Sequence, residues 1–166
     1  MYHFSLHKAE YGRGFSAVEI VVGISIISLV LLFSIHAIMR SVTTGAEQVD
    51  HTRALYLAEE ALETARFLHD KGWSEIEALT NDTPYYVDIS TTDINVSATP
   101  QLVDGLFLQT ITLTDVYRRN IDDDIVASTS GSTKYIDPNS RFVTARVYWG
   151  TPTSTVSISM YLSNFY

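Results

Sequence analysis

Residues 20–39 read IVVGISIISLVLLFSIHAIM and contain no Asp, Glu, Lys or Arg. As a helix rising about 1.5 Å per residue, this run would be about 30 Å long, which matches the hydrocarbon core of a bilayer. A secretory signal has a shorter apolar core of about 7–15 residues, followed by a small-residue cleavage site. Here Arg40 follows directly, with no convincing A-x-A site. The run therefore predicts a membrane helix that the protein retains, at the least as a single-span anchor.

Length, charge and the lack of cysteine exclude or disfavour several kinds of function for this chain. The 166 residues favour one domain, and 19 acidic against 11 basic residues give a net charge of -8. That charge disfavours a nucleic-acid partner bound through a broad basic surface. Cysteine is absent, which excludes disulfides, thiolate metal sites and a cysteine nucleophile. We expect no cofactor.

A short leader, residues 1–14, precedes the apolar run and carries Lys8 and Arg13. Positive charge at this place favours keeping the N-terminus in the cytoplasm, although Glu10 partly offsets it. Glu19 lies just inside the apolar stretch. A carboxylate costs on the order of 3 kcal/mol at the bilayer centre and is usually functional there. Its place near the end of the run lowers that cost without removing it.

The order of these features, RGFSAVE followed by about twenty apolar residues, resembles the class III signal of type IV pilins and type II secretion pseudopilins. The resemblance implies that a membrane prepilin peptidase cuts between Gly14 and Phe15 and then N-methylates Phe15. It also implies that Glu19 is the glutamate that such subunits carry five places into the mature chain. The new amine of one subunit would pair with Glu19 of the next, which would fix the register of stacked helices.

A local role for the same glutamate stays open. The stretch from Ser16 to Glu19 has the S-x-x-E pattern of a capping box, in which Ser16 would cap the helix and Glu19 would return the hydrogen bond. A Glu19→Gln change keeps that box but removes the charge, so it separates the two roles.

A second pattern follows Arg40 without a break. One helical face is formed at spacings of 3, 1, 3, 4 and 3 by Ala54, Leu57, Ala58, Ala61, Ala65 and Leu68. Lys71-Gly72 is a credible stop, so one helix is predicted over about 16–70. We interpret Glu59 and Glu63 as a solvated face. The stretch ALYLAEEALETARFLHDKGW also resembles this region of minor pilins and pseudopilins.

One departure concerns the apolar helix. Many major pilins have a proline midway along it, whereas the first proline here is Pro84 and His36 stands near the expected place. We interpret His36 as a tolerated polar residue facing a neighbour. The missing proline favours a minor pilin or pseudopilin over a main pilus subunit.

From residue 80 onward the composition turns to Thr, Ser, Val, Ile and Tyr, which favours strands. Apolar and polar residues alternate over 142–149 and 156–163, with a turn at 150–153 that suggests a hairpin. Further strands are predicted over about 106–114, 85–90 and 94–98. The predicted fold is α+β, a long N-terminal helix packed on a C-terminal antiparallel sheet, and the same order is the pilin layout.

Residues 118–140 are polar and rich in turn formers, and predict an exposed loop. Within it, Asp122, Asp123 and Asp124 are weak candidates for calcium, because the spacing of a calcium loop is missing. A solvated acidic turn is the alternative. Arg118 and Arg119 would contact phosphate in a DNA-uptake pilin, or otherwise pair with these aspartates.

Enzymatic function is disfavoured. All five histidines precede residue 70, so the predicted sheet region alone cannot supply a Ser-His-Asp site or an imidazole metal site. The eight glycines are scattered and form no phosphate loop. The chain looks like the substrate of an enzyme.

The predicted organisation is a leader (1–14), a membrane and filament-core helix (15–40), its amphipathic extension (41–72) and a β head (80–166). We expect a minor pilin or pseudopilin in the cytoplasmic membrane, with its head outside, whose partners are the peptidase, other subunits and the membrane. The alternatives are an anchored binding module that does not polymerise and a DNA-uptake pilin.

Overall fold

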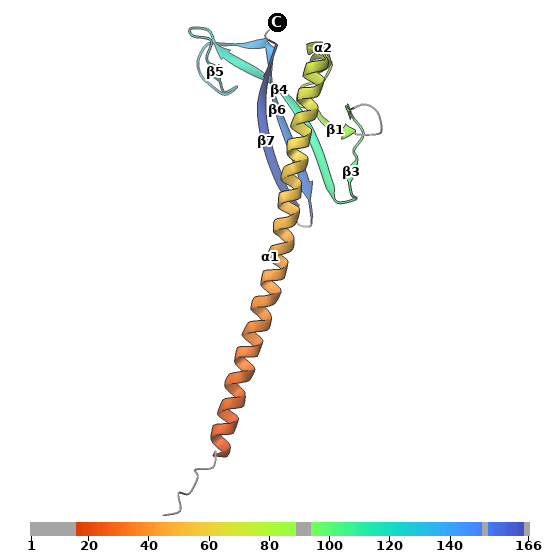
Figure 1. The fold of residues 1–166 in the computed structure, drawn as a ribbon. Helices are drawn as coiled ribbons and strands as arrows, with labels where there is room; N and C mark the ends of the chain where they lie inside the picture. The colour runs from red at the N-terminus through yellow and green to blue at the C-terminus, as the bar shows by residue number, and fades with distance from the viewer. Residues whose placement is uncertain (1–15, 89–93, 151–152, 165–166) are drawn as a thin grey trace, which may run out of the picture. The chain divides into compact units, whose positions relative to one another are not determined.

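The computed structural model describes residues 16–88, 94–150 and 153–164. Its first element is helix α1 (Ala17–Lys71), coloured red to yellow in Figure 1, which confirms the helix predicted over 16–70. The chain divides into two compact units, Met1–Ala46 and Glu47–Tyr166, and α1 contributes to both. We call residues 16–46 the N-terminal segment and the described residues from 47 onward the head, and describe each by itself.

Helix α1 ends where the basic residue followed by glycine predicts. Lys71 is its last residue, and the amide of Gly72 donates to the carbonyl oxygens of Leu68 and His69 at 3.3 and 3.1 Å. A second, short helix, α2 (Trp73–Glu77), begins directly afterwards and was not predicted. It buries Ile76 completely, so this single turn closes one end of the head core.

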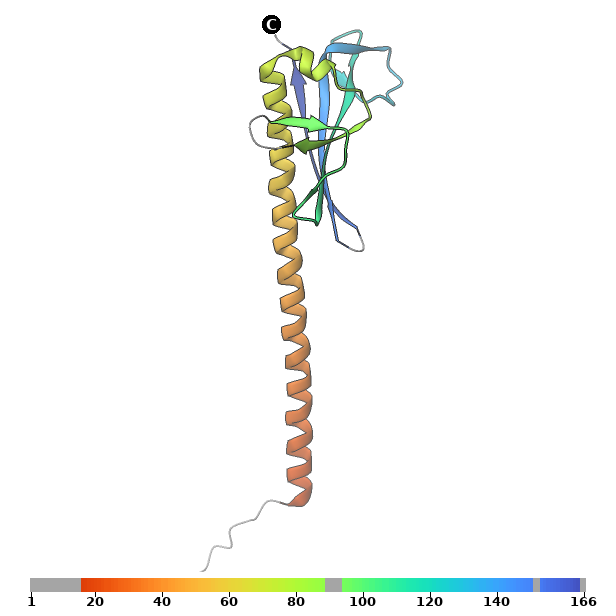
Figure 2. The same ribbon diagram turned by 90° about the vertical axis from the view of Figure 1, so that its right-hand side faces the viewer.

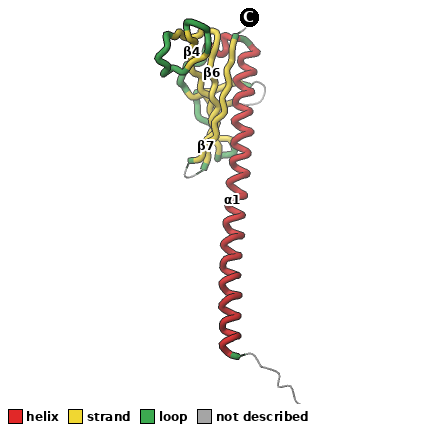
Figure 3. Tube along the Cα trace, turned by 90° about the vertical axis from the view of Figure 1, so that its left-hand side faces the viewer, coloured by secondary structure: helices red, strands yellow, loops and turns green. Residues whose placement is uncertain are grey.

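The sheet of the head is antiparallel and follows the order β2-β1-β4-β6-β7, with β3 and β5 also paired to β4. Figure 3 shows the long strands running beside α1. The bounds of the described strands are β1 (Pro84–Asp88), β2 (Asn95–Ser97), β3 (Leu102–Val103), β4 (Phe107–Arg119), β5 (Ile125–Val126), β6 (Lys134–Trp149) and β7 (Ser154–Ser163). The predicted α+β fold is therefore confirmed.

Residues 47–71 of α1 lie against one face of this sheet (Figure 2), and the core fills the space between them. From the helix, Ala54, Ala58 and Ala61 are fully buried. From the sheet, Val143 and Ala145 of β6 meet them in the same cluster. Alanine has no side chain beyond Cβ, so the helix side of this core is built of small residues, while the larger residues of β4 fill the remaining volume.

The alternation predicted for the last two strands is confirmed. On β6, Val143, Ala145 and Val147 are fully buried, whereas Arg146 between them is exposed. On β7, Val156 and Leu162 are buried and the serines between them lie on the other face. The two strands pair from Ser140↔Ser163 to Trp149↔Ser154, so they form the predicted hairpin. Gly150 begins the turn at a φ of 72°, a conformation that glycine adopts without strain.

The long exposed loop predicted over 118–140 is wrong for about half of its extent, since residues 120–124 and 127–133 do lie outside the strands. Strand β4 continues to Arg119, β5 pairs with it, and β6 already begins at Lys134. A register shift explains why the pattern was hidden. Asp115 opposes Arg141, but its neighbour Val116 opposes Asp137, so residues 138–140 are extra on the β6 side. Pro138 lies within this bulge, a position in a sheet that tolerates proline.

Candidate functional site

The apolar surface of the N-terminal segment is the first candidate site. Its large apolar side chains range from 50% exposed at Ile35 to 73% exposed at Phe33. The most apolar 18-residue window of α1 is 0% buried, and α1 is long and apolar enough to cross a membrane by length and composition. Among the described residues none of these side chains is buried, so their hydrophobicity needs another explanation.

Polar side chains on the same segment bond to their own helix. The hydroxyls of Ser25, Ser28 and Ser34 each donate to the carbonyl oxygen four residues earlier, at 2.8 Å. Nδ1 of His36 lies 2.8 Å from the carbonyl oxygen of Leu32. These bonds lower the cost of placing the groups in an apolar environment.

Ser16 and Glu19, the residues predicted for helix capping and charge pairing, both lie at the start of α1. Ser16 directly precedes the helix, and its Oγ accepts a long hydrogen bond from the amide of Val18 at 3.4 Å. Its carbonyl oxygen accepts from the amide of Glu19 at 2.9 Å. Glu19 lies in the first turn and is exposed. A carboxylate is favourable there because the amide groups of a helix N-terminus carry partial positive charge. Gly14 and Phe15, the predicted cleavage and methylation positions, lie outside the described residues.

The three consecutive aspartates of the head, 122–124, accept hydrogen bonds from arginine and tyrosine side chains. Nε of Arg119 donates to Asp122 at 2.9 Å and its Nη2 to Asp124 at 3.0 Å. The hydroxyl of Tyr135 donates to Asp123 at 2.9 Å, and this hydrogen bond raises the pKa of Tyr135. Within the described ranges, no group of three or more His, Cys, Asp or Glu is arranged to hold a metal ion. The ion pairs of Arg119 are the expected alternative to phosphate contact, whereas Arg118 pairs with Asp137 outside this triplet.

A largely buried ion pair beside this turn was missed by sequence reasoning. Nε of Arg118 donates to Oδ2 of Asp137, and these side chains are 25% and 11% exposed. Ser140 donates to the same oxygen at 2.7 Å, and the amide of Asn139 donates to Oδ1 at 2.9 Å. Burial by itself raises the pKa of Asp137, but the three hydrogen bonds outweigh it and hold the pKa below its usual value. The bond to Asp137 likewise raises the pKa of Arg118.

The network ties the bulge to both neighbouring elements. Oγ of Ser140 lies 3.1 Å from Oγ of Ser163 on β7, and Arg118 reaches Asp137 from β4. The only sequence signal was the turn-forming run from Asp137 to Ser140, which is compatible with any loop. The arrangement fixes the irregular end of the sheet and explains the cluster without a ligand.

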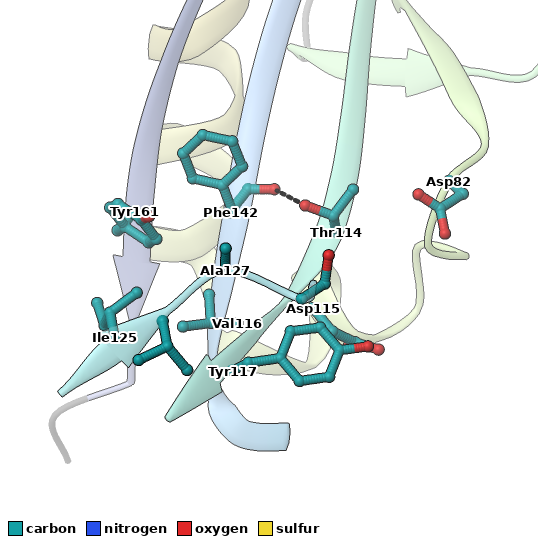
Figure 4. Close-up of a pocket in the computed structure, with 11 residues that line it drawn as sticks. Asp82, Thr114, Asp115, Val116, Tyr117, Ile125, Ala127, Phe142 and Tyr161 are labelled. Atoms are coloured by element: carbon teal, nitrogen blue, oxygen red, sulfur yellow. Dashed lines mark hydrogen bonds between the residues drawn. The ribbon is translucent and has the colours of Figure 1, made fainter. Parts of the chain in front are cut away.

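A groove of about 420 Å³ lies on the sheet face opposite α1 (Figure 4). Phe142 and Tyr161 form its aromatic wall, with ring centroids 4.7 Å apart. Ile125 lies below Tyr161, and Asp82 and Asp115 lie on the other side. Asp115 accepts from Asn81 at 2.6 Å and lies 3.8 Å from Nη1 of Arg141, so the groove has a mixed polar and apolar lining with a partly neutralised acidic rim.

His69 lies between an aspartate and a serine, as in a Ser-His-Asp site, but it contacts the wrong atom of the serine. Nδ1 of His69 lies 3.1 Å from Asp70, and Nε2 lies 3.3 Å from Ser163. The Ser163 atom is the main-chain oxygen, which cannot act as the nucleophile of a Ser-His-Asp site. His69 therefore bridges α1 and β7.

Comparisons with known proteins supply no relative from which a role could be transferred: no family model, no curated protein and no solved structure matches the chain. The functional conclusion consequently depends on the residues and contacts described above.

Proposed function

We propose that the chain is the precursor of a minor type IV pilin or pseudopilin, a membrane-inserted subunit that is processed and then assembled into a filament. The observation that carries the proposal is the position of the Gly14-Phe15 step and Glu19 at the head of an apolar helix. No residue in the most apolar 18-residue window of that helix is buried among the described residues.

The physical argument has two parts. An apolar helix without partners in its own fold is stabilised by lipid before assembly and by the helices of other subunits afterwards. Cleavage before Phe15 would create an amine close to Glu19, and an amine–carboxylate pair between subunits would favour one register over its neighbours. In this scheme the chain is inserted with its N-terminus in the cytoplasm, the head lies outside, and the chain is a substrate of the peptidase rather than an enzyme.

Mass spectrometry of the N-terminus of the mature protein, recovered from its native membrane, tests the processing step. We expect a chain that begins at Phe15 and carries a methyl group on its terminal nitrogen. A protein that begins at Met1, or that is cut elsewhere, contradicts the proposal and favours a membrane-anchored binding module.

A variant series tests the assembly step. Glu19→Gln keeps a side chain that serves in a capping box but removes the charge, and we expect it to lower incorporation into sheared filaments by about tenfold or more. Glu47→Gln removes an exposed charge from the same helix and is the matched control. Normal incorporation of Glu19→Gln, with a defect in Ser16→Ala, would instead assign Glu19 and Ser16 to helix capping alone.

A further inference from the structure

Strand β7 (Ser154–Ser163) is the last strand of the sheet, and in the described part of the chain only β6 pairs with it. It forms the left margin of the sheet in Figure 1. In a strand, main-chain donors and acceptors point alternately to the two sides, so every second residue of β7 presents its groups away from β6. At the C-terminal end, the carbonyl oxygen of Ser163 contacts His69. For residues 154–162, the described residues supply no main-chain partner on that side.

The edge has none of the features by which proteins usually prevent strand addition. Edge strands are commonly short, bulged, or interrupted by charged residues or proline. The opposite edge fits this rule, because β2 has only three residues. In contrast, β7 has ten residues, contains no charge and no proline, and keeps one register along its whole pairing with β6. It is therefore a regular and unprotected template for another strand.

Uncovered apolar atoms flank this edge on both faces of the sheet. On the face toward α1, Ile158 and Met160 are only half-buried, although Val156 and Leu162 on either side of them are buried. On the other face Tyr161 is 52% exposed. A strand added beside β7 would cover these side chains and satisfy the main-chain groups at the same time.

We propose that the β7 edge binds an extended segment of a different polypeptide as an additional strand of the sheet. The main-chain groups require an extended backbone, and the half-buried Ile158 and Met160 require apolar side chains at alternate positions of that segment. Charges at those positions are disfavoured, because β7 has no charge to pair with them and burial would remove their solvent.

A second copy of the chain fits less well. Antiparallel pairing of β7 with itself about a two-fold axis would reverse the direction of residues 47–71 between the two copies. However, two chains anchored in one membrane through their N-terminal segments would both emerge from the same side of that membrane, so residues 47–71 would have the same direction in both copies. This exclusion, unlike the strand proposal itself, rests on the proposed function.

The test uses the full chain in detergent micelles and a synthetic nine-residue peptide in which threonine and valine alternate between terminal lysines. We expect fluorescence anisotropy to show binding, and hydrogen exchange to slow within residues 154–163. A peptide with the same side chains but N-methylated at alternate residues cannot donate on one side, and we expect it to bind about tenfold more weakly or worse.

Two variants refine the assignment. Met160→Lys places a charge beside the edge, and we expect it to weaken peptide binding by about tenfold. Val96→Lys is the matched control, because Val96 is also a half-buried apolar residue on an edge strand, at the opposite margin. If Met160→Lys fails to fold, comparing the unmethylated and N-methylated peptides on the unaltered chain still tests the proposal.

Three results would overturn the proposal: equal binding of both peptides, protection outside β7, and absence of binding up to about 1 mM peptide. Concentration-dependent dimers joined through β7 would overturn the choice of a different polypeptide. None of these measurements involves cleavage at Gly14, so the strand proposal and the proposed function can fail separately.

Discussion

The two halves of α1 use hydrophobic residues in opposite ways. Along residues 17–46 the helix carries large apolar side chains, such as Phe33 at 73% exposed, and none of them is buried among the described residues. Along residues 47–71 the buried face is built mainly of alanine, and Ala54, Ala58 and Ala61 are fully buried. Hydrophobicity is therefore greatest where it does not stabilise this fold. The difference is that the second half contributes to the core of the head, whereas the first half leaves its apolar side chains exposed among the described residues.

The largest expected effect compares one phenylalanine from each region. Phe107 of β4 is 0% exposed and belongs to the head core. Phe107→Ala should lower the free energy of unfolding of the head by about 3–5 kcal/mol, through lost burial and the cavity left behind. Phe33→Ala should change it by less than about 0.5 kcal/mol, because Phe33 is 73% exposed and lies outside the head core. Both tryptophans lie in the head, so their fluorescence during denaturant unfolding in micelles measures this quantity.

A loss of several kcal/mol from Phe33→Ala would break the comparison, since it would mean that the apolar half also stabilises the head. A loss confined to Phe107→Ala would support the separation of the two roles.

The next prediction enlarges a side chain instead of shortening it. Ala58→Leu inserts three carbons where the helix meets the sheet, and overpacking of this kind costs about 1–3 kcal/mol. Ala37→Leu makes the same change on the exposed half of α1 and should leave head unfolding unaltered. The same fluorescence measurement applies. Equal stability of the two variants would show that Ala58 was not selected for close approach.

The regions where periodicity is strong were predictable from the sequence. Helix α1 and the β6–β7 hairpin follow repeats that burial largely confirms, although Leu62 and Thr64 of α1 are also buried outside the predicted face and Leu57 is only half-buried. Helix α2 was missed because five residues are too few to show a helical period. The distal part of β6 was missed because the extra residues 138–140 interrupt its alternation, and the distal part of β4 because its polar residues were interpreted as the start of a loop.

Sites were harder to predict than elements for a related reason. Arg118 and Asp137 are 19 residues apart and meet only through the β4–β6 register, which no local pattern reveals. The pairing of Asp122 and Asp124 with Arg119 was open to prediction because it lies within a few residues. The predicted partner of Glu19 belongs to another subunit, so its role stays a prediction.

A third prediction concerns the charges of the head and is smaller. The pKa of Asp137 is lowered in the folded chain, so its contribution to stability is present above the pKa of an unfolded aspartate, about 3.9, and is lost as the pH falls through the folded value. Asp137→Asn should therefore cost about 1–2 kcal/mol near pH 7, and this difference from wild type should disappear in strong acid. Unfolding curves between about pH 2 and pH 7 measure it.

Asp124→Asn is the matched control for that series, because Asp124 pairs with the neighbouring Arg119 but is 68% exposed. We expect it to change stability by less than about 0.5 kcal/mol at each pH. A pH-independent loss in Asp137→Asn would contradict an ionic role and leave only the hydrogen-bonded shape of the bulge.

The smallest expected effect comes from comparing a substitution on the exposed face of α1 in the head with one on its buried face. Glu63 pairs with Arg66 one turn later, but their side chains are 66% and 52% exposed, so solvent and salt screen the attraction. Glu63→Gln should change the free energy of unfolding by no more than about 0.5 kcal/mol, and that small change should vanish in high salt. Ala61→Leu, two residues earlier on the buried face, should cost several times more. If the charge change instead cost more than the packing change, the close approach of α1 to the sheet would not be what stabilises the head.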